Sequence, residues 1–232
     1  MIDNRIDNHE WVRETRFGRW FLSTQTWVKY VLDVAIKDFA ALSASDNKKI
    51  GTILDAGCGQ GSAFNILNEH FKPAQIIGLD VDSELLEIAK DAAEGCPCEV
   101  TIKHQKASDT DIPDNSVDMI FCHQLLHHTK NQMGALLEFK RILAPDGVLL
   151  VGESCESFIH SLPVKLLFKH PDLTQKDATG YIDLVREAGF VFQDKDIQKT
   201  SPWWSRPFLG VFDKWIKREI AATEILIVAR KG

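Results

Sequence analysis

The sequence lacks several features that would assign it to a broad class of proteins. It contains no run of 18 apolar residues, so we expect no membrane-spanning helix. Its first ten residues, MIDNRIDNHE, lack the apolar core of a secretory signal, which favours a cytoplasmic protein. The 27 lysines and arginines are scattered among 33 acidic residues and form no basic tract. A broad phosphate-binding surface is therefore not expected, and nucleic acid is a poor candidate substrate.

Cysteine is scarce, and its spacing follows no pairing pattern. The five cysteines are odd in number and include no repeated Cys-x-x-Cys motif, so we expect free thiols. Cys96 and Cys98 flank a proline, a spacing too tight for the common zinc sites. The adjacent residues His127 and His128 would point about 100° apart on a helix, so both could not easily bind one ion. The sequence thus predicts no metal site.

The length and amino-acid composition of the chain suit one α/β domain. With 232 residues, 44% of them apolar and 26% charged, the chain can bury a full core. A helical pattern over residues 24–42 precedes apolar strands that alternate with helices, and this alternation predicts a parallel sheet covered on both faces. Ligands bind such sheets at the carboxyl ends of the strands. Within a single domain of residues 1–232 we assign an N-terminal helical cap (1–45), a core (50–155), and a cap segment with the last helix and strands (156–232).

The strongest local motif is the glycine-rich loop ILDAGCGQG at residues 53–61. Gly57, Gly59 and Gly61 let the backbone turn sharply and let a ligand lie close against it. Their spacing is one residue shorter than that of the dinucleotide-binding fingerprint. Asp55 would repel a pyrophosphate, but it suits a cation such as an α-amino or sulfonium group. The loop therefore disfavours a nicotinamide-dependent oxidoreductase.

An acidic residue ends the next expected strand, residues 75–80. Asp80 lies 19 residues after Gly61, and a carboxylate at this place can accept hydrogen bonds from both hydroxyls of a ribose. Val81 follows at the same edge, and Asp82 is the better candidate for the N-cap of the next helix. We predict that Asp80 and Val81 line a nucleoside pocket beside the glycine loop.

Together with LAPDG at residues 143–147, these motifs resemble those of the class I S-adenosylmethionine-dependent methyltransferases. The resemblance is closest to the small-molecule branch that includes the ubiquinone and menaquinone methyltransferases, and it covers roughly residues 50–155. It implies a doubly wound, Rossmann-like α/β sheet of seven strands, mostly parallel with the last strand antiparallel, plus the N-terminal helical cap. It also implies S-adenosylmethionine as cofactor and S-adenosylhomocysteine as product, with the methionine part on the glycine loop and the ribose on Asp80.

Two further segments resemble this family with departures. Residues 107–118, ASDTDIPDNSVD, resemble its adenine-binding segment, but the family's Asp aligns with Ser108, one residue before Asp109. Either side chain can accept a hydrogen bond from the adenine amino group, so we place both in the pocket. In the family the end of the fourth strand lies under the sulfonium. The resemblance therefore places His123 against the cofactor or the acceptor.

The sequence does not assign a catalytic residue. Methyl transfer from a sulfonium needs a general base only if the acceptor must lose a proton, and His123 or His127 would then be the candidates. The run RFGRWF at residues 16–21 leads us to expect that the N-terminal segment folds over the cofactor, with Arg16 or Arg19 near its carboxylate or near an acidic acceptor.

Aromatic clusters are the candidate walls of an acceptor pocket. One precedes the core, and a second occupies the segment 200–217, where Trp203 and Trp204 suit either a lid or a dimer contact. The sequence as a whole predicts an enzyme that methylates a small molecule at oxygen, nitrogen or carbon, and it leaves a homodimer open. The alternatives are a cofactor-binding, non-catalytic or regulatory protein of the same fold, and a protein or RNA methyltransferase.

Overall fold

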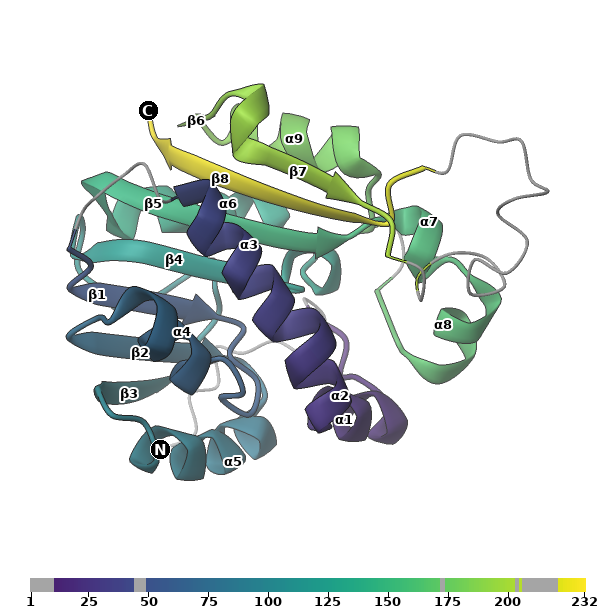
Figure 1. The fold of residues 1–232 in the computed structure, drawn as a ribbon, viewed down its shortest axis with the longest axis horizontal. Helices are drawn as coiled ribbons and strands as arrows, with labels where there is room; N and C mark the ends of the chain where they lie inside the picture. Colours follow the sequence, from purple (N-terminus) through teal and green to yellow (C-terminus); the bar gives the residue numbers. More distant parts are fainter. Residues whose placement is uncertain (1–10, 44–48, 172–173, 203–204, 206–220) are drawn as a thin grey trace.

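A mixed β-sheet organises the computed structural model, which describes residues 11–43, 49–171, 174–202, 205 and 221–232. Its eight strands follow the order β3-β2-β1-β4-β5-β8-β6, and β7 also pairs with β8 (Figure 1). The strands are β1 (Thr52–Ala56), β2 (Gln75–Asp80), β3 (Glu99–His104), β4 (Val117–His123), β5 (Leu143–Ser154), β6 (Phe190–Val191), β7 (Ile197–Thr200) and β8 (Glu224–Lys231).

The direction of the strands confirms the predicted doubly wound topology. Strands β1 to β5 pair in parallel, and β8 runs antiparallel to β5, with Leu150 opposite Val228. Beyond β5 two short strands, β6 and β7, both pair with β8, so the sheet has eight strands where the resemblance implies seven. A 3-10 turn, η4 (Asp194–Asp196), separates them, because Gln193 and Asp196 cap each other's backbone.

Helices cover both faces of the sheet, as the alternation of strands and helices predicts (Figure 1). Phe39 and Phe64 are fully buried in the core of one face, and Phe139 and Tyr181 are fully buried in the core of the other. The first face is covered by α3 (Asp33–Ser43), α4 (Phe64–Phe71) and α5 (Ser83–Glu94), and the second by α6 (Gln132–Ile142) and α9 (Ala178–Glu187).

The N-terminal region forms more helix than the sequence predicts. The helix expected over residues 24–42 is present as α2 (Gln25–Trp27), a π-helical stretch η1 (Val28–Leu32) and α3. Before it lies α1 (Arg16–Leu22), a helix of seven residues that the sequence analysis did not predict. Thr15 begins α1, since its hydroxyl accepts a hydrogen bond from the amide of Gly18 at 2.9 Å.

Short helices gather beyond the carboxyl ends of the parallel strands (Figure 1). On one side lie α1 and α2, and on the other α7 (Glu156–Ile159) and α8 (Leu162–Leu167). The hydroxyl of Thr15 donates to the carbonyl of Leu167 at 2.6 Å and so ties the two sides together. The second aromatic cluster of the sequence lies outside the described residues: Trp203, Trp204, Phe208, Phe212 and Trp215.

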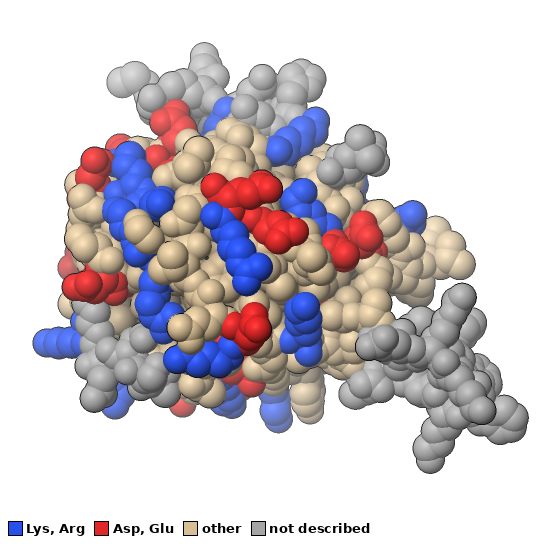
Figure 2. All heavy atoms as spheres, turned by 90° about the horizontal axis from the view of Figure 1, so that it is seen from above, with Lys and Arg blue, Asp and Glu red and all other residues tan. Residues whose placement is uncertain are grey.

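Charge is mixed on the face of the molecule seen in Figure 2, where basic and acidic side chains lie next to one another. Ion pairs within helices include Lys37 with Asp33 in α3 and Lys90 with Glu87 in α5. No helix within the described ranges combines the length and the apolar character needed to cross a membrane.

Candidate cofactor and acceptor site

The glycine loop after β1 adopts a backbone that only glycine tolerates well. Gly57, Gly59 and Gly61 have φ angles of +78°, +53° and +77°. A Cβ atom on Gly61 would lie 2.5 Å from the ring of Phe64, and one on Gly57 would lie 2.9 Å from Leu125. At Gly59 a Cβ would meet no atom closer than 4.0 Å, so the loop is open to a ligand at this point.

Asp80 holds the loop in place from the end of β2. Its Oδ2 atom accepts a hydrogen bond from the amide of Gly59 at 2.8 Å, and its Oδ1 atom accepts one from the amide of Asp82 at 2.8 Å. Burial raises the pKa of this carboxyl group. Each oxygen keeps a further lone pair, so the group can still accept hydrogen bonds from a ligand.

A pocket of about 190 Å³, here called the glycine-loop pocket, opens beside these residues. Five of the nine site residues predicted from the sequence line it, namely Gly57, Gly59, Asp80, Val81 and Ser108. The N-terminal segment also lines the pocket, through Trp11, Val12, Glu14, Arg19 and Leu22. The other four predicted residues, Asp55, Gly61, Asp109 and His123, lie elsewhere.

Asp55 is buried at the end of β1, and its side chain is only 3% exposed. Its Oδ2 atom has no hydrogen-bond partner among the described residues. Burial, together with the nearby charge of Asp80, raises the pKa of Asp55 to about 8. An unsatisfied buried carboxylate fits a cationic group of a ligand, which is the role that the sequence predicts for it.

The remaining predicted residues have other surroundings. Gly61 packs against Phe64 within the loop, and Asp109 is exposed, with its amide donating to the carbonyl of Lys106 at 3.1 Å. His123 stacks on Phe121 with ring centroids 5.6 Å apart and lines a small cavity of about 140 Å³, whose lining also includes Gln124. Burial lowers the pKa of His123 to about 3, and the nearby His127 adds to this effect.

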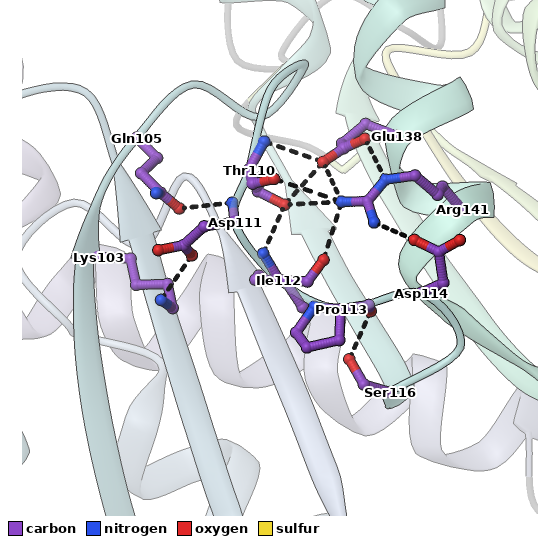
Figure 3. Close-up of polar contacts among 10 residues, drawn as sticks. All are labelled: Lys103, Gln105, Thr110, Asp111, Ile112, Pro113, Asp114, Ser116, Glu138 and Arg141. Carbon is purple, nitrogen blue, oxygen red and sulfur yellow. Dashed lines mark hydrogen bonds and ion pairs between the residues drawn. The ribbon is translucent and has the colours of Figure 1, made fainter.

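A polar network fixes the loop that carries Ser108 to helix α6 (Figure 3). The amide and hydroxyl of Thr110 donate to Glu138 at 2.9 and 2.7 Å, and Arg141 donates to both carboxylate oxygens of Glu138. Arg141 also donates to the carbonyl of Ile112 at 2.8 Å and pairs with Asp114. The hydrogen bonds from Arg141 lower the pKa of Glu138 to about 2. This network holds one wall of the glycine-loop pocket.

A larger cavity of about 690 Å³, here called the aromatic cavity, lies beneath the short helices. Its aromatic wall comes from both sides of the cap: Phe17, Phe21, Trp27, Tyr30, Phe158 and Phe168. No lysine or arginine is found among its described lining residues. Of the two predicted arginines, Arg16 is exposed, and Arg19 pairs with Glu84 at 2.8 Å in the wall of the glycine-loop pocket.

The two cavities share four lining residues that the sequence did not point to: Glu14, Leu22, Gln124 and His128. Gln124 follows β4 with a φ angle of +56°, and this turn places Gln124, rather than His123, against both cavities. The two spaces therefore adjoin at the ends of β1 and β4.

Histidines line the aromatic cavity beside this shared wall. His127 is buried at the 3-10 turn η3 (Leu126–His128), and its Nδ1 atom lies 2.5 Å from Oε2 of Glu153. His128 and His170 lie next to it, with ring centroids 4.3 and 5.2 Å from that of His127. Burial lowers the pKa of His170 to about 4 and that of His128 well below its usual range.

Comparison with known proteins agrees with this geometry. Residues 54–151 match the methyltransferase domain family. Phosphoethanolamine N-methyltransferase 3 of Arabidopsis thaliana is 26% identical over 176 residues, which are 74% of this chain and 33% of that enzyme. The chain thus spans about a third of the length of this curated relative.

Solved structures share the fold at lower identity. The [4+2]-cyclase SpnF matches with a TM-score of 0.65 and 22% identity over 87% of this chain and 81% of that one. An S-adenosylmethionine-dependent methyltransferase from Aquifex aeolicus matches with a TM-score of 0.61 and 16% identity, over 93% and 97% of the two chains. The chain is thus similar to the methyltransferase domain family over residues 54–151, and it shares the fold of the solved structures.

Proposed function

We propose that this protein transfers the methyl group of S-adenosylmethionine to a small, largely apolar molecule held in the aromatic cavity. The observation that carries the proposal is the shared wall of Glu14, Leu22, Gln124 and His128 between the two cavities. A cofactor seated on the glycine loop would then present its sulfonium toward an acceptor on the other side of that wall. Bound S-adenosylmethionine supplies an activated methyl group, so the protein mainly orients the acceptor and excludes water.

Named residues take separate parts in this proposal. Asp80 accepts from the ribose hydroxyls, Ser108 from the adenine amino group, and Asp55 offers its unsatisfied oxygen to the cationic end of the methionine part. Trp27 and Phe21, with ring centroids 6.0 Å apart, wall the acceptor side. The cofactor residues follow the sequence prediction except for Asp109 and His123, which are not included. Asp55 also lines neither cavity, and it is included because its buried oxygen has no partner among the described residues.

The charge of the aromatic cavity supports an acceptor class different from that of the plant relative. A phosphorylated acceptor such as phosphoethanolamine is bound most strongly by cationic partners for its phosphate, arginine above all. The described lining offers carboxylates at Glu14 and Glu224 and no basic side chain other than histidine. We therefore expect an acceptor with an aromatic or aliphatic body and one or a few polar groups.

The experiment has two stages. Isothermal calorimetry should show binding of S-adenosylhomocysteine and none of NAD. Purified protein is then incubated with methyl-labelled S-adenosylmethionine and a panel of apolar phenols, amines and carboxylic acids, with phosphoethanolamine as the matched polar control. Label should pass to an apolar member of the panel. Binding of the cofactor with no labelled product from a cell-extract pool of small molecules would favour the non-catalytic alternative, because a shared fold does not by itself establish the reaction.

A further inference from the structure

The aromatic cavity contains a histidine cluster whose role is not explained by methyl transfer alone. His127 and His128 belong to η3, and His170 belongs to the segment after α8. One ring nitrogen of each lies within 4.8 Å of the corresponding nitrogens of the other two. The sequence predicts no metal site because His127 and His128 would point in different directions on an α-helix. In the 3-10 turn their ring centroids are only 4.3 Å apart, and His170 joins them from another part of the chain.

We propose that His127, His128 and His170 bind one divalent transition-metal ion, zinc in the first instance, with an open coordination position toward the aromatic cavity. Three imidazole nitrogens with a fourth position left for water or substrate form a ligand set of catalytic zinc sites. Zinc–nitrogen bonds of about 2.0–2.1 Å in a tetrahedron separate the ligand nitrogens by about 3.3 Å. In the structure these nitrogens lie within 4.8 Å of one another, so the rings must turn and move closer when an ion binds.

The surroundings of His127 match those of a metal ligand. Its Nδ1 atom contacts the Glu153 carboxylate at 2.5 Å, which leaves Nε2 as the atom able to bind an ion. A ligand histidine that donates its other N–H to a carboxylate is a recurrent arrangement in metal sites, because it fixes the tautomer and the ring orientation. Glu153 is fully buried at the end of β5, so its own position is fixed.

The other two histidines contact His127 and each other through their rings, and the backbone around them holds them in position. Within the described parts of the chain, the imidazole nitrogens of His128 and His170 make no hydrogen bond. The backbone around them is well tied: Glu14 accepts from the amide of Lys169 at 2.7 Å, and Thr174 donates to the carbonyl of His127 at 2.6 Å. Positioned ligands without partners of their own are what a metal site requires before the ion binds.

A metal ion here would give the aromatic cavity the positive charge that its described side chains lack. Its catalytic use rests on the proposed function, because His128 lines both cavities and would place a metal-bound acceptor oxygen near the cofactor. In that reaction an acceptor hydroxyl bound to the ion loses its proton to water. Its oxygen then forms a bond to the methyl carbon, and the carbon–sulfur bond breaks with its electron pair left on sulfur.

The test is a calorimetric titration of protein without a histidine tag, using zinc sulfate as the probe. We expect one zinc ion per chain, and cobalt chloride should give visible absorption bands of nitrogen-ligated, low-coordinate cobalt. His170→Ala should weaken zinc binding by roughly tenfold or more, and Glu153→Gln by about 10- to 100-fold through the loss of orientation of His127. Zinc should raise the melting temperature of the wild type and not that of His170→Ala. His128→Gln serves as a second ligand variant if His170→Ala fails to fold.

Two control variants define the site. His160→Ala removes an exposed histidine outside the cluster and should leave zinc binding unchanged. Cys96→Ser with Cys98→Ser removes the thiols whose Sγ atoms lie 3.5 Å apart, and zinc binding should survive this change. Zinc binding that persists in His170→Ala, or that disappears with the two cysteines, would overturn the proposal.

A separate titration distinguishes this inference from the proposed function. Metal-free wild-type protein is titrated with S-adenosylhomocysteine. Zinc binding through the histidines without binding of S-adenosylhomocysteine would defeat the proposed function and keep the metal site. Binding of S-adenosylhomocysteine with no zinc binding at the cluster would defeat the metal site alone.

Discussion

The Nδ1 atom of His127 lies 2.5 Å from the Oε2 atom of Glu153, and the exposed fractions of the two side chains are 3% and 0%. The same carboxylate accepts hydrogen bonds from the amides of Leu125 and Leu126 at 3.0 and 2.7 Å. Glu153 therefore links the end of β5 to the turn η3, and the position of the cavity-lining histidines depends on one buried acidic group.

Replacement of Glu153 tests whether this buried carboxylate holds the turn η3. Glu153→Ala should lower the free energy of unfolding by about 3 kcal/mol or more, because each buried donor left without a partner costs about 1–3 kcal/mol. Urea denaturation measures the change. Glu156→Ala, an exposed residue three positions later, is the matched control and should shift stability by less than about 0.5 kcal/mol. Equal small effects of both substitutions would show that Glu153 does not hold η3.

Replacement of Asp80 tests the ribose contact. Asp80→Ala should weaken binding of S-adenosylhomocysteine by about 1.5–3 kcal/mol, or about 10- to 150-fold, through the loss of charge-assisted hydrogen bonds. It also removes the acceptor for the Gly59 amide, so the melting temperature must be measured beside the affinity. Asp80→Asn keeps one side-chain oxygen and should have a smaller effect. Wild-type affinity in Asp80→Ala would limit this residue to a structural role.

Ser108 and Asp109 offer a comparison between neighbouring positions. Ser108 lines the glycine-loop pocket, whereas Asp109 is exposed and outside it. Calorimetry with S-adenosylhomocysteine should therefore show a loss of about 0.5–1.5 kcal/mol for Ser108→Ala and almost none for Asp109→Ala. A larger loss of affinity in Asp109→Ala than in Ser108→Ala would assign the adenine contact to Asp109.

Asp55 makes stability depend on pH. Its pKa rises from an ordinary value near 4 to about 8 on folding, so the folded chain binds more protons than the unfolded chain between these values. Stability from this group is complete below pH of about 4 and is lost as pH rises toward about 8. Urea denaturation over this range should show the decline, and Asp55→Asn should reduce it.

The same residue links cofactor binding to proton release. If the cationic end of the methionine part meets Asp55, binding favours the ionised carboxylate, and a proton leaves at pH values below about 8. Calorimetry with S-adenosylhomocysteine in two buffers of different ionisation enthalpy counts this proton. A binding enthalpy that does not depend on the buffer would show that the cationic group of the ligand does not contact Asp55.

Deletion of residues 1–22 tests the N-terminal cover. Trp11, Val12 and Arg19 line the glycine-loop pocket, so the truncated protein should bind S-adenosylhomocysteine more weakly while keeping its sheet. Arg13→Gln is a milder variant, because Arg13 pairs with Asp82 at 2.8 Å and with Glu84 at 3.0 Å. Unaltered affinity in a stable truncated chain would remove the N-terminal segment from the cofactor site.

The sheet and its helices were predictable because the signals lie close together in the sequence. The apolar residues at 75–80 indicate a buried strand, and the glycines at 57–61 indicate a tight turn in that same stretch of backbone. Helix α1 was not predicted: it has only seven residues, and its aromatic residues face cavity and solvent rather than a core. The break between β6 and β7 depends on mutual capping by Gln193 and Asp196, which a strand pattern does not reveal.

Five of the residues predicted to bind the cofactor line the glycine-loop pocket, and aromatic residues before the core, such as Phe21 and Trp27, line the aromatic cavity. Asp80 and Ser108 fall within motifs whose spacing can be read along the chain. His170 reaches His127 only through the fold of the segment after α8, and no local pattern marks it. Glu153 carried a usable signal, since an acidic residue that ends an apolar strand, like Asp80, faces the ligand edge of the sheet.

The segment from Trp11 to Leu22 lines both the glycine-loop pocket and the aromatic cavity, and Glu14 and Thr15 join it to Lys169 and Leu167. Because one segment covers both cavities, release of a ligand from either cavity depends on the opening of that segment. When opening of this segment limits turnover, the thioether product and the methylated acceptor dissociate with the same rate constant, although they differ chemically. Substitutions that loosen the contacts of Glu14 or Thr15 would then shorten the residence times of the thioether and the methylated acceptor by the same factor.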